Sequence, residues 1–205
     1  QTICQHHIDY VDVPYDIKTG CVDIDLFNDE LADGAVAIVI QQPNFFACLD
    51  EVDALTDWAH AHGVLVTACV NPMSLAVLKA PGQWGETGAD IVCGEGQPLG
   101  LPLSSGGPYF GFFCCRKSHI RQMPGRLVGR STDALGQSSF VLTLQAREQH
   151  IRRGKASSNI CTNQGLAVIA ATIYLSLMGA EGLARVSQAS YQATHNLVAA
   201  LTSIE

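Results

Sequence analysis

The first half of the chain alternates between short apolar runs and longer amphipathic or polar stretches. Three of the runs are rich in β-branched residues, which is typical of strands that a parallel sheet buries on both faces. These runs are residues 35–40, 64–70 and 89–93. Between the first two, residues 50–62 place apolar side chains at helical spacing, and Gly63 is expected to end that helix. With a short helix at residues 74–79, the order of elements predicts a mostly parallel, doubly wound α/β sheet flanked by helices.

The segments on either side are predicted from weaker patterns. Residues 1–26 predict a strand, a proline turn and a second strand at residues 22–26, where apolar and acidic positions alternate. Asp25 is expected to cap a short helix at residues 26–31. Later in the chain we expect an aromatic strand, a short helix, a further strand and a charged turn or short helix. These elements are predicted at residues 109–115, 117–123, 140–144 and 146–153.

The C-terminal part of the chain is helical in pattern and strongly apolar. Residues 164–178 are almost entirely apolar, Gly179 is expected to end that helix, and residues 182–205 start another. A helix without a polar face must be buried on more than one side, by its own protein or by a partner. The chain has no initiator methionine and stops within the helical pattern, so an excised piece of a longer protein is expected.

Composition places the chain among globular proteins and limits the classes of partner that it could bind. Of the 205 residues, 47% are apolar and 15% are charged, and the formal net charge is −7. The net charge, without a basic stripe to neutralise phosphates, argues against nucleic acid as the main partner. The clustered cations are Arg147, Arg152, Arg153 and Lys155, within one turn-rich stretch. No signal peptide and no apolar run near about 18 residues is found, so no membrane partner is expected.

Eight cysteines stand along the chain without a CxxC pair or the Cys/His spacing of a zinc site. Most lie in apolar runs, so we expect reduced core thiols and a reducing, cytoplasmic location. The neighbours Cys114 and Cys115 belong to a predicted strand and would point to opposite faces, which argues against a redox pair.

A glycine- and proline-rich loop at residues 94–108 joins two of the predicted strands. In α/β enzymes such loops lie at the carboxyl ends of the strands, where ligands bind. No lysine occurs between Lys79 and Lys117, so the loop has no amine that could hold a cofactor as a Schiff base.

Six segments together resemble the glycine decarboxylase P-protein of the glycine cleavage system, and most of all subunit 1 of its two-subunit bacterial form. They are residues 41–46 (QQPNFF), 94–100 (GEGQPLG), 106–113 (GGPYFGFF), 121–129 (RQMPGRLVG), 147–153 (REQHIRR) and 157–163 (SSNICTN). The resemblance implies the large domain of the aspartate-aminotransferase-like, fold-type-I pyridoxal-phosphate (PLP) fold, in a chain about half the family's length. It assigns residues 1–185 to that domain and residues 186–205 to a helix leading to a C-terminal small domain.

Two departures from the family's cofactor pattern indicate a degenerate site. Where the cofactor-binding P-protein subunit has a His-Lys pair, this chain has Gln97 and Pro98, and proline has no amine. Where fold-type-I enzymes place an aspartate for the pyridinium N–H⁺, this chain has the neutral Asn71. We interpret these three residues as a remnant site and predict no catalytic residue or metal ligand here; an anion-binding turn at Gln97-Pro98 stays open.

The resemblance also implies a contribution to a neighbouring chain. In related enzymes the neighbour lends a polar loop to the cofactor phosphate, and Ser157, Ser158 and Asn159 stand at that place, just before a helix N-terminus. We expect them to bind the phosphate of PLP in trans, with Arg152 or Arg153 nearby for charge.

The remaining candidates are single residues with two interpretations each. Arg126 follows a Pro-Gly turn and forms either a structural salt bridge or a contact with a substrate or side-chain carboxylate. His150 lies in an Arg/Glu/Gln cluster, and interface contact and function stay equally open for it. His60 and His62 have no carboxylate or cysteine at ligand spacing and are expected at the surface or a helix end.

The resemblance finally implies an activity and its partners. The family complex, an oxidoreductase, decarboxylates glycine through PLP and passes the aminomethyl group to the lipoyl arm of H-protein. This chain would be a subunit of a cytoplasmic heterotetramer, with glycine decarboxylase subunit 2 holding the cofactor and lipoylated H-protein as a further partner. Two alternatives stay open. One is an inactive scaffold or binding module of this fold, and the other is an independent aminotransferase- or desulfurase-like enzyme, which would need a lysine in residues 94–108.

Overall fold

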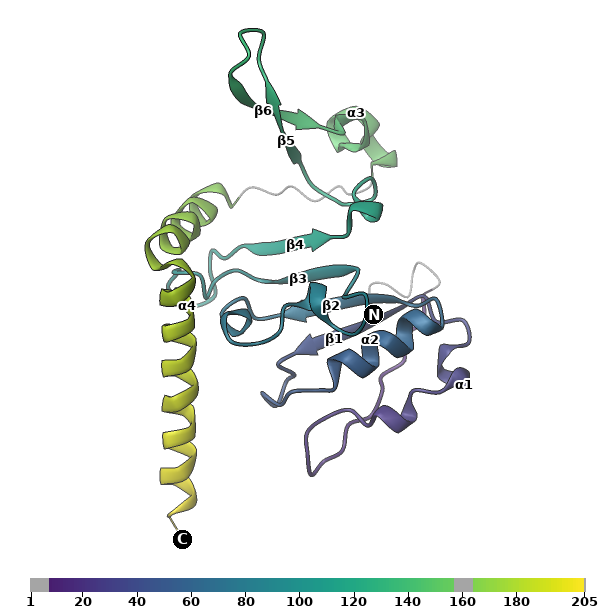
Figure 1. Ribbon diagram of the computed structural model, residues 1–205, viewed down its shortest axis with the longest axis vertical. Coiled ribbons are helices and arrows are strands. Elements are labelled where there is room, and N and C mark those ends of the chain that lie inside the picture. Colours follow the sequence, from purple (N-terminus) through teal and green to yellow (C-terminus); the bar gives the residue numbers. More distant parts are fainter. Residues whose placement is uncertain (1–7, 157–163, 205) are drawn as a thin grey trace.

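The structure is a computed structural model that describes residues 8–156 and 164–204. Four strands form one sheet in the order β1-β2-β3-β4, with the first three parallel and the fourth antiparallel to β3 (Figure 1). The strands are β1 (Ala37–Gln42), β2 (Leu65–Val70), β3 (Ile91–Glu95) and β4 (Gly111–Cys115). The mostly parallel sheet predicted from the apolar runs is confirmed, and the aromatic strand at its edge runs antiparallel.

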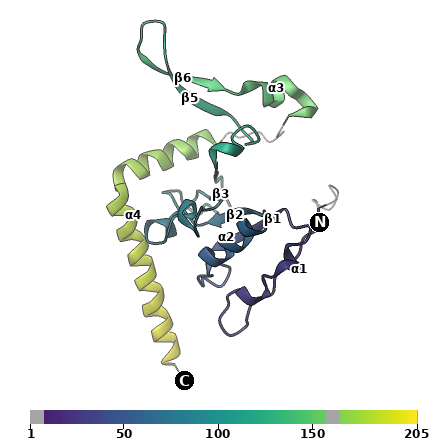
Figure 2. The same ribbon diagram turned by 45° about the vertical axis from the view of Figure 1, so that its right-hand side comes forward.

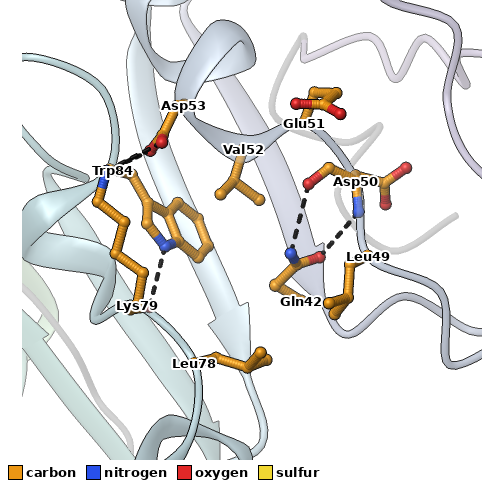
Figure 3. A pocket seen from close by; sticks show the side chains of 9 residues that line it. All are labelled: Gln42, Leu49, Asp50, Glu51, Val52, Asp53, Leu78, Lys79 and Trp84. Atoms are coloured by element: carbon orange, nitrogen blue, oxygen red, sulfur yellow. Dashed lines mark hydrogen bonds and ion pairs between the residues drawn. The ribbon is translucent and has the colours of Figure 1, made fainter.

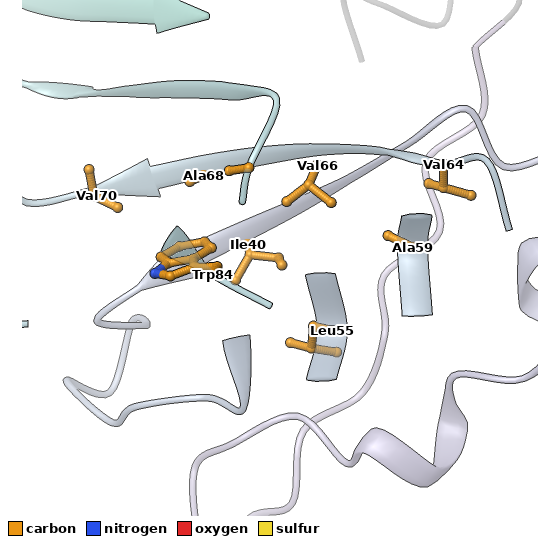
Figure 4. Packing of buried hydrophobic residues seen from close by; sticks show 9 residues of the cluster. Ile40, Leu55, Ala59, Val64, Val66, Ala68, Val70 and Trp84 are labelled. Atoms are coloured by element: carbon orange, nitrogen blue, oxygen red, sulfur yellow. The ribbon is translucent and has the colours of Figure 1, made fainter. Parts of the chain in front are cut away.

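Helix α2 (Val52–Ala61) covers one face of the sheet and closes the hydrophobic core. Its Leu55 and Ala59 pack against the inward-facing side chains of β1 and β2, and Trp84 fills the space beside them (Figure 4). The inward-facing residues of these strands include Ile40, Val66, Ala68 and Val70. On the opposite face of the edge strand β1, Val39 is 67% exposed.

The N-terminal segment differs from its prediction. Residues 8–26 form no strand, and Tyr15 and Val22 make an isolated antiparallel bridge instead. Asn28, rather than Asp25, accepts the capping hydrogen bond of the short helix that follows. The short elements of this segment are η2 (Ile24–Leu26) and α1 (Asp29–Ala32). None of the described side chains before β1 is buried, so the alternation of apolar and acidic residues reflects a turn-rich surface.

Residues 117–155 project from the sheet as a separate arm (Figures 1 and 2). The arm consists of an antiparallel hairpin, β5 and β6, and the one-turn helix α3. The bounds are β5 (Leu127–Thr132), β6 (Ser138–Thr143) and α3 (Gln149–Arg152). Single 3-10 turns fill the connections in the arm and elsewhere, namely η3 (Ser74–Ala76), η4 (Pro81–Gln83), η5 (Lys117–His119), η6 (Gln145–Arg147) and η7 (Arg153–Lys155). The predicted strand at residues 140–144 is found as β6, whereas β5 was not predicted.

The long helix α4 (Gly165–Thr202) bends at Gly179, whose φ of 60° and ψ of −176° are not helical (Figures 1 and 2). The sequence predicted one helix to end at this residue. Ala171 is buried, but Leu166 and Leu177 are 83% and 81% exposed. The described chain buries this helix on one side only, so its burial on a second side, by another part of the protein or by a partner, stays a prediction. By length and composition alone, α4 is the one described helix that could cross a membrane.

Candidate functional site

The candidate site lies at the edge of the sheet where the parallel strands end. Gln42 ends β1, Asn71 follows β2 directly, and Gln97 follows β3 after one intervening residue. In α/β proteins, ligands bind at the carboxyl ends of the strands. The structure thus brings the predicted remnant residues Asn71, Gln97 and Pro98 to one edge of the sheet, on neighbouring strands.

Asn71 is exposed, and a local turn uses its side chain. The Oδ1 atom accepts a hydrogen bond from the backbone N–H of Met73 at 2.9 Å, and the Asn71 carbonyl accepts one from the Ser74 hydroxyl at 2.7 Å. A carboxamide carries no negative charge, and here its oxygen already has a donor. Asn71 therefore lacks the carboxylate that would pair with a protonated ring nitrogen.

Gln97 and Pro98 belong to a loop that closes on itself. The Nε2 atom of Gln97 donates to the Leu101 carbonyl oxygen at 2.6 Å, and the Gln97 backbone N–H donates to Oε1 of Glu95 at 3.0 Å. Pro98 is half-buried and offers neither an amine nor an N–H. The Glu95 carboxylate beside this turn disfavours an anion, so the geometry favours a structural remnant over an anion-binding turn.

Helix α4 packs against this edge and holds both loops. The hydroxyl of the buried Ser187 donates to the carbonyl oxygen of Met73 at 2.6 Å, in the turn that follows Asn71. Gly100, in the loop after β3, has φ of +88° and lies so close to Tyr174 that a Cβ there would come 2.6 Å from the ring. One helix therefore fixes the loops that follow β2 and β3.

A cavity of about 240 Å³ lies beside the end of β1 and the start of α2 (Figure 3). Lys79 lines it, with the ammonium 2.8 Å from Oδ1 of Asp53, while the amide of Gln42 bonds to the backbone of Asp50. The Lys79 ammonium and the Gly85 N–H hold the pKa of Asp53 below its ordinary value of 3.8. The side chain of Lys79 is therefore held in an ion pair with Asp53.

The described residues do not fit a covalently held pyridoxal phosphate. Such a cofactor needs a lysine amine for the Schiff base and a carboxylate for the ring nitrogen. The loop after β3 supplies no lysine, and Asn71 supplies no charge. The loop after β3 therefore lacks the lysine, and the position directly after β2 lacks the carboxylate.

The other predicted site residues that the structure describes lie on the arm and not at the sheet edge. Arg126 precedes β5, and His150 and Arg152 belong to α3. Arg153 begins η7 with φ of 53°. All four are exposed, and Nε of Arg152 donates to the Ala146 carbonyl oxygen at 2.9 Å, within the arm. The residues predicted to act in trans lie outside the described part of the chain: Ser157, Ser158 and Asn159.

A buried carboxylate at the opposite end of β3 was not predicted. Asp90 is 6% exposed and accepts a hydrogen bond from the Val66 N–H at 2.9 Å. It also pairs with Nε2 of His60 at 3.0 Å and with Nε of Arg116 at 3.2 Å. Burial raises the pKa of Asp90, but these three groups together outweigh it and lower the pKa below 3.8. The signal in the sequence was an aspartate inside an apolar run. Because a buried carboxylate must be paired, that position could have indicated a network of this kind.

His60 and His62 lie at the end of α2, as predicted, and each contacts a carboxylate that is distant in sequence. His60 pairs with Asp90, and Nε2 of His62 lies 3.0 Å from Oδ1 of Asp29. The Trp58 carbonyl at Nδ1, followed by the Asp29 carboxylate, raises the pKa of His62. Both carboxylates are 30 or more residues away in sequence, so spacing along the helix could not reveal them.

The described cysteines are free thiols that lie near the surface rather than in the core. Cys69 and Cys93 are partners across β2 and β3, and burial raises the pKa of Cys93. Within residues 8–156 and 164–204, no three His, Cys, Asp or Glu side chains gather as a metal site.

The solved structures that share this fold include the following three. A glycine decarboxylase (P-protein) of the glycine cleavage system, crystallised in inhibitor-bound form, is 48% identical with a TM-score of 0.76, over 80% of this chain and 37% of that one. Sphingosine-1-phosphate lyase of Burkholderia pseudomallei (18% identical, TM-score 0.57) and mouse CSAD (15%, 0.60) share the fold alone. Both matches cover 94% of this chain. They cover 41% of the lyase chain and 39% of the CSAD chain. The chain therefore has the fold of the fold-type-I PLP enzymes.

Sequence comparison narrows this class to one family. Residues 8–205 match the glycine cleavage system P-protein family, and the chain belongs to it. Relatives named "Probable glycine dehydrogenase (decarboxylating) subunit 1" are 61% identical in Coxiella burnetii and 64% identical in Thioalkalivibrio sulfidiphilus, over 98% and 93% of this chain. The matches cover 45% and 42% of these relatives, so the chain spans less than half of their length.

Proposed function

We propose that this chain is part of subunit 1 of a glycine dehydrogenase (decarboxylating), which completes a site whose PLP is held by subunit 2. The complex decarboxylates glycine and passes the aminomethyl group to the lipoyl group of H-protein. Membership of the P-protein family supports the activity, and the subunit name of the relatives supports a second chain. The chain itself performs no catalysis in this proposal.

The observation that carries the proposal is the loop after β3. The fold-type-I framework is kept at 48% identity to a glycine decarboxylase, yet Pro98 has no amine and the Gln97 amide is bonded to Leu101. A Schiff base requires a lysine, so a chain with this framework and without the lysine is suited to support a site on another chain.

Borohydride reduction tests where the cofactor is attached. The full-length protein would be reduced with PLP, alone and with subunit 2, and digested for mass spectrometry. We expect the pyridoxyl group on a lysine of subunit 2 and on none of the four lysines here, which are Lys18, Lys79, Lys117 and Lys155. One pyridoxyl group per chain on Lys79 would contradict the proposal. Lys79→Arg is the control, because it removes the amine and keeps a cation beside Asp53.

The contribution of Ser157, Ser158 and Asn159 in trans extends this proposal. Replacing Ser158 and Asn159 by alanine removes two side chains that could bond a phosphate, each bond to a charged group being worth about 1.5–3 kcal/mol. The assembled complex is therefore expected to bind PLP at least about tenfold more weakly. Ser176→Ala, on the exposed side of α4, is the matched control. Equal affinity in the double variant and the control would rule the contribution out.

The missing lysine fits an inactive scaffold or binding module of the same fold equally well. Co-purification with a lysine-bearing subunit, and glycine decarboxylation by the pair, separates the two functions. The proposal that this chain is part of subunit 1 includes a cytoplasmic location and no membrane or nucleic-acid partner. The free thiols support a reducing location, and the bonds of Ser187 and the packing of Tyr174 against the sheet edge support a globular role for α4.

A further inference from the structure

The charges of this chain are divided between two parts of the molecule. The arm, residues 117–155, holds eight of the twelve Lys and Arg residues and two of the nineteen Asp and Glu residues, a formal charge of +6. The rest of the chain carries −13, and twelve of its acids lie in residues 9–57. Figure 1 shows the sheet between the arm (green) and the N-terminal segment with α1 (purple). The net charge of −7 conceals a strongly basic projection.

The cations of the arm are presented to solvent. Lys117, Arg121, Arg126 and Arg130 are exposed, as are Arg152, Arg153 and Lys155. The arm has two carboxylates of its own, Asp133 and Glu148, which are too few to balance them. Arg116, directly before the arm, is bound to the buried Asp90 and ties the base of the arm to the sheet.

Apolar side chains lie among these cations. Val128 on β5 and Phe140 on β6 are 63% and 72% exposed, and Leu135 at the hairpin turn is 82% exposed. No described side chain of the arm is buried. Because a two-stranded hairpin is marginally stable alone in water, these residues need a surface to pack on. Arginine and aromatic side chains together are typical of protein–protein contacts.

We propose that residues 117–155 dock on a carboxylate-rich protein surface of the cofactor-holding partner subunit. The identity of the partner rests on the proposed function. Two observations favour this partner. Exposed apolar residues among the cations favour a protein over a nucleic acid. In addition, Lys155 ends the arm two residues before Ser157, the first of the residues proposed to reach the partner's cofactor. The arm and the neighbouring residues 157–159 would then contact the same partner subunit.

The charge of the remaining molecule gives this contact its direction. A body of −13 repels an acidic partner, while the +6 arm attracts it, so an approaching acidic surface is steered to the arm. Such steering is screened by salt over distances of about 10 Å at 0.1 M ionic strength. Association is therefore expected to weaken as the salt concentration rises.

The test compares two charge-reversed double variants of the full-length chain with equal change in net charge. Arg121→Glu with Arg130→Glu alters exposed cations of the arm that are outside the candidate site. Lys18→Glu with Arg185→Glu alters exposed cations of the body and is the control. Affinity for purified subunit 2 would be measured by analytical ultracentrifugation at low and high salt, with circular dichroism to verify folding. The visible spectrum of bound PLP would be recorded on the same samples.

We expect the arm variant to bind subunit 2 at least about tenfold more weakly than the control at low salt, with a smaller difference at high salt. Equal affinity of the two variants for subunit 2 would overturn the proposal that the arm is the docking surface. The proposed function would still hold if the complexes keep the spectrum of bound PLP. Arm-dependent self-association without subunit 2, or tighter binding to a DNA or RNA oligonucleotide than to subunit 2, would also overturn the docking surface. No complex of the unmodified chains at any salt concentration would contradict both proposals.

Discussion

Asp90 shows how one residue can hold together several segments of this fold. Its buried carboxylate bonds to β2 through Val66, to α2 through His60 and to the strand end before the arm through Arg116. A carboxylate with this little exposure is tolerated because its partners replace the water it loses. The start of β3 therefore depends on ionised Asp90.

We predict that Asp90→Asn destabilises the chain in a pH-dependent way. Because the folded state lowers the pKa of Asp90 below 3.8, the ionised group stabilises the fold above that pH, and the contribution is lost as the pH falls through the lowered pKa. At neutral pH the loss is about 1.5–3 kcal/mol, the value of a hydrogen bond to a charged group. Urea denaturation across this range should show the variant and wild type converging in acid. A constant difference would contradict the assignment, and the exposed Asp12→Asn is the control.

Gly88 offers a second test at this scale. Its φ is +78°, and a Cβ would lie 2.3 Å from the carbonyl oxygen of Gly82. Gly34 has φ of +73°, and a Cβ there would meet nothing within 4 Å, so it shares the strain without the clash. Gly34→Ala should cost about 1–2 kcal/mol and Gly88→Ala about 1–3 kcal/mol more. Thermal unfolding of both variants measures the difference, and equal costs would mean that the close approach is absent.

The positions of the remnant residues could be predicted from sequence, but the use of their side chains could not. Asn71 and Gln97 follow apolar runs, and a parallel sheet places the ends of such runs at one edge. Their hydrogen bonds to Met73 and Leu101 depend on the exact turn, which no apolar pattern encodes. The partners of His60 were hidden for the same reason.

Elements that face the core were predicted, and elements without a core face were not. The strands β1 to β3 were located from continuous apolar runs rich in β-branched residues, and helix α2 from apolar residues at helical spacing. The β5 strand has Gly129 and Arg130 beside an exposed Val128, so it shows no apolar face. The acidic alternation at residues 22–26 suggested a strand, but in the described residues its pairing is limited to the isolated bridge between Val22 and Tyr15.

The contact of α4 with the sheet edge yields a prediction for this element. Ser187→Ala leaves the Met73 carbonyl without its buried donor and should lower the free energy of unfolding by about 1–3 kcal/mol. Ser176→Ala is the matched control, because its hydroxyl is exposed and bonds to Thr172 within the same helix. The control should change stability by less than about 0.5 kcal/mol. Denaturant unfolding compares the two, and equal losses would mean that α4 does not hold this edge.

At the scale of the whole molecule, two features support the proposal that this chain acts with a partner subunit. The carboxyl edge of the sheet keeps the fold-type-I framework without the cofactor lysine, and both the arm and α4 carry exposed apolar residues. Charge follows the same division, with a basic arm on an acidic body. Net composition could not predict this, because the cations are spread along residues 117–155 and gather only when the arm projects.

The visible absorption spectrum with pyridoxal phosphate tests the central claim most directly. The full-length chain would be titrated with the cofactor alone, and then together with subunit 2. We predict no Schiff-base band for the chain alone and a stoichiometric band when subunit 2 is present. A Schiff-base band from the isolated chain that disappears when Lys79 is replaced by arginine would contradict the account.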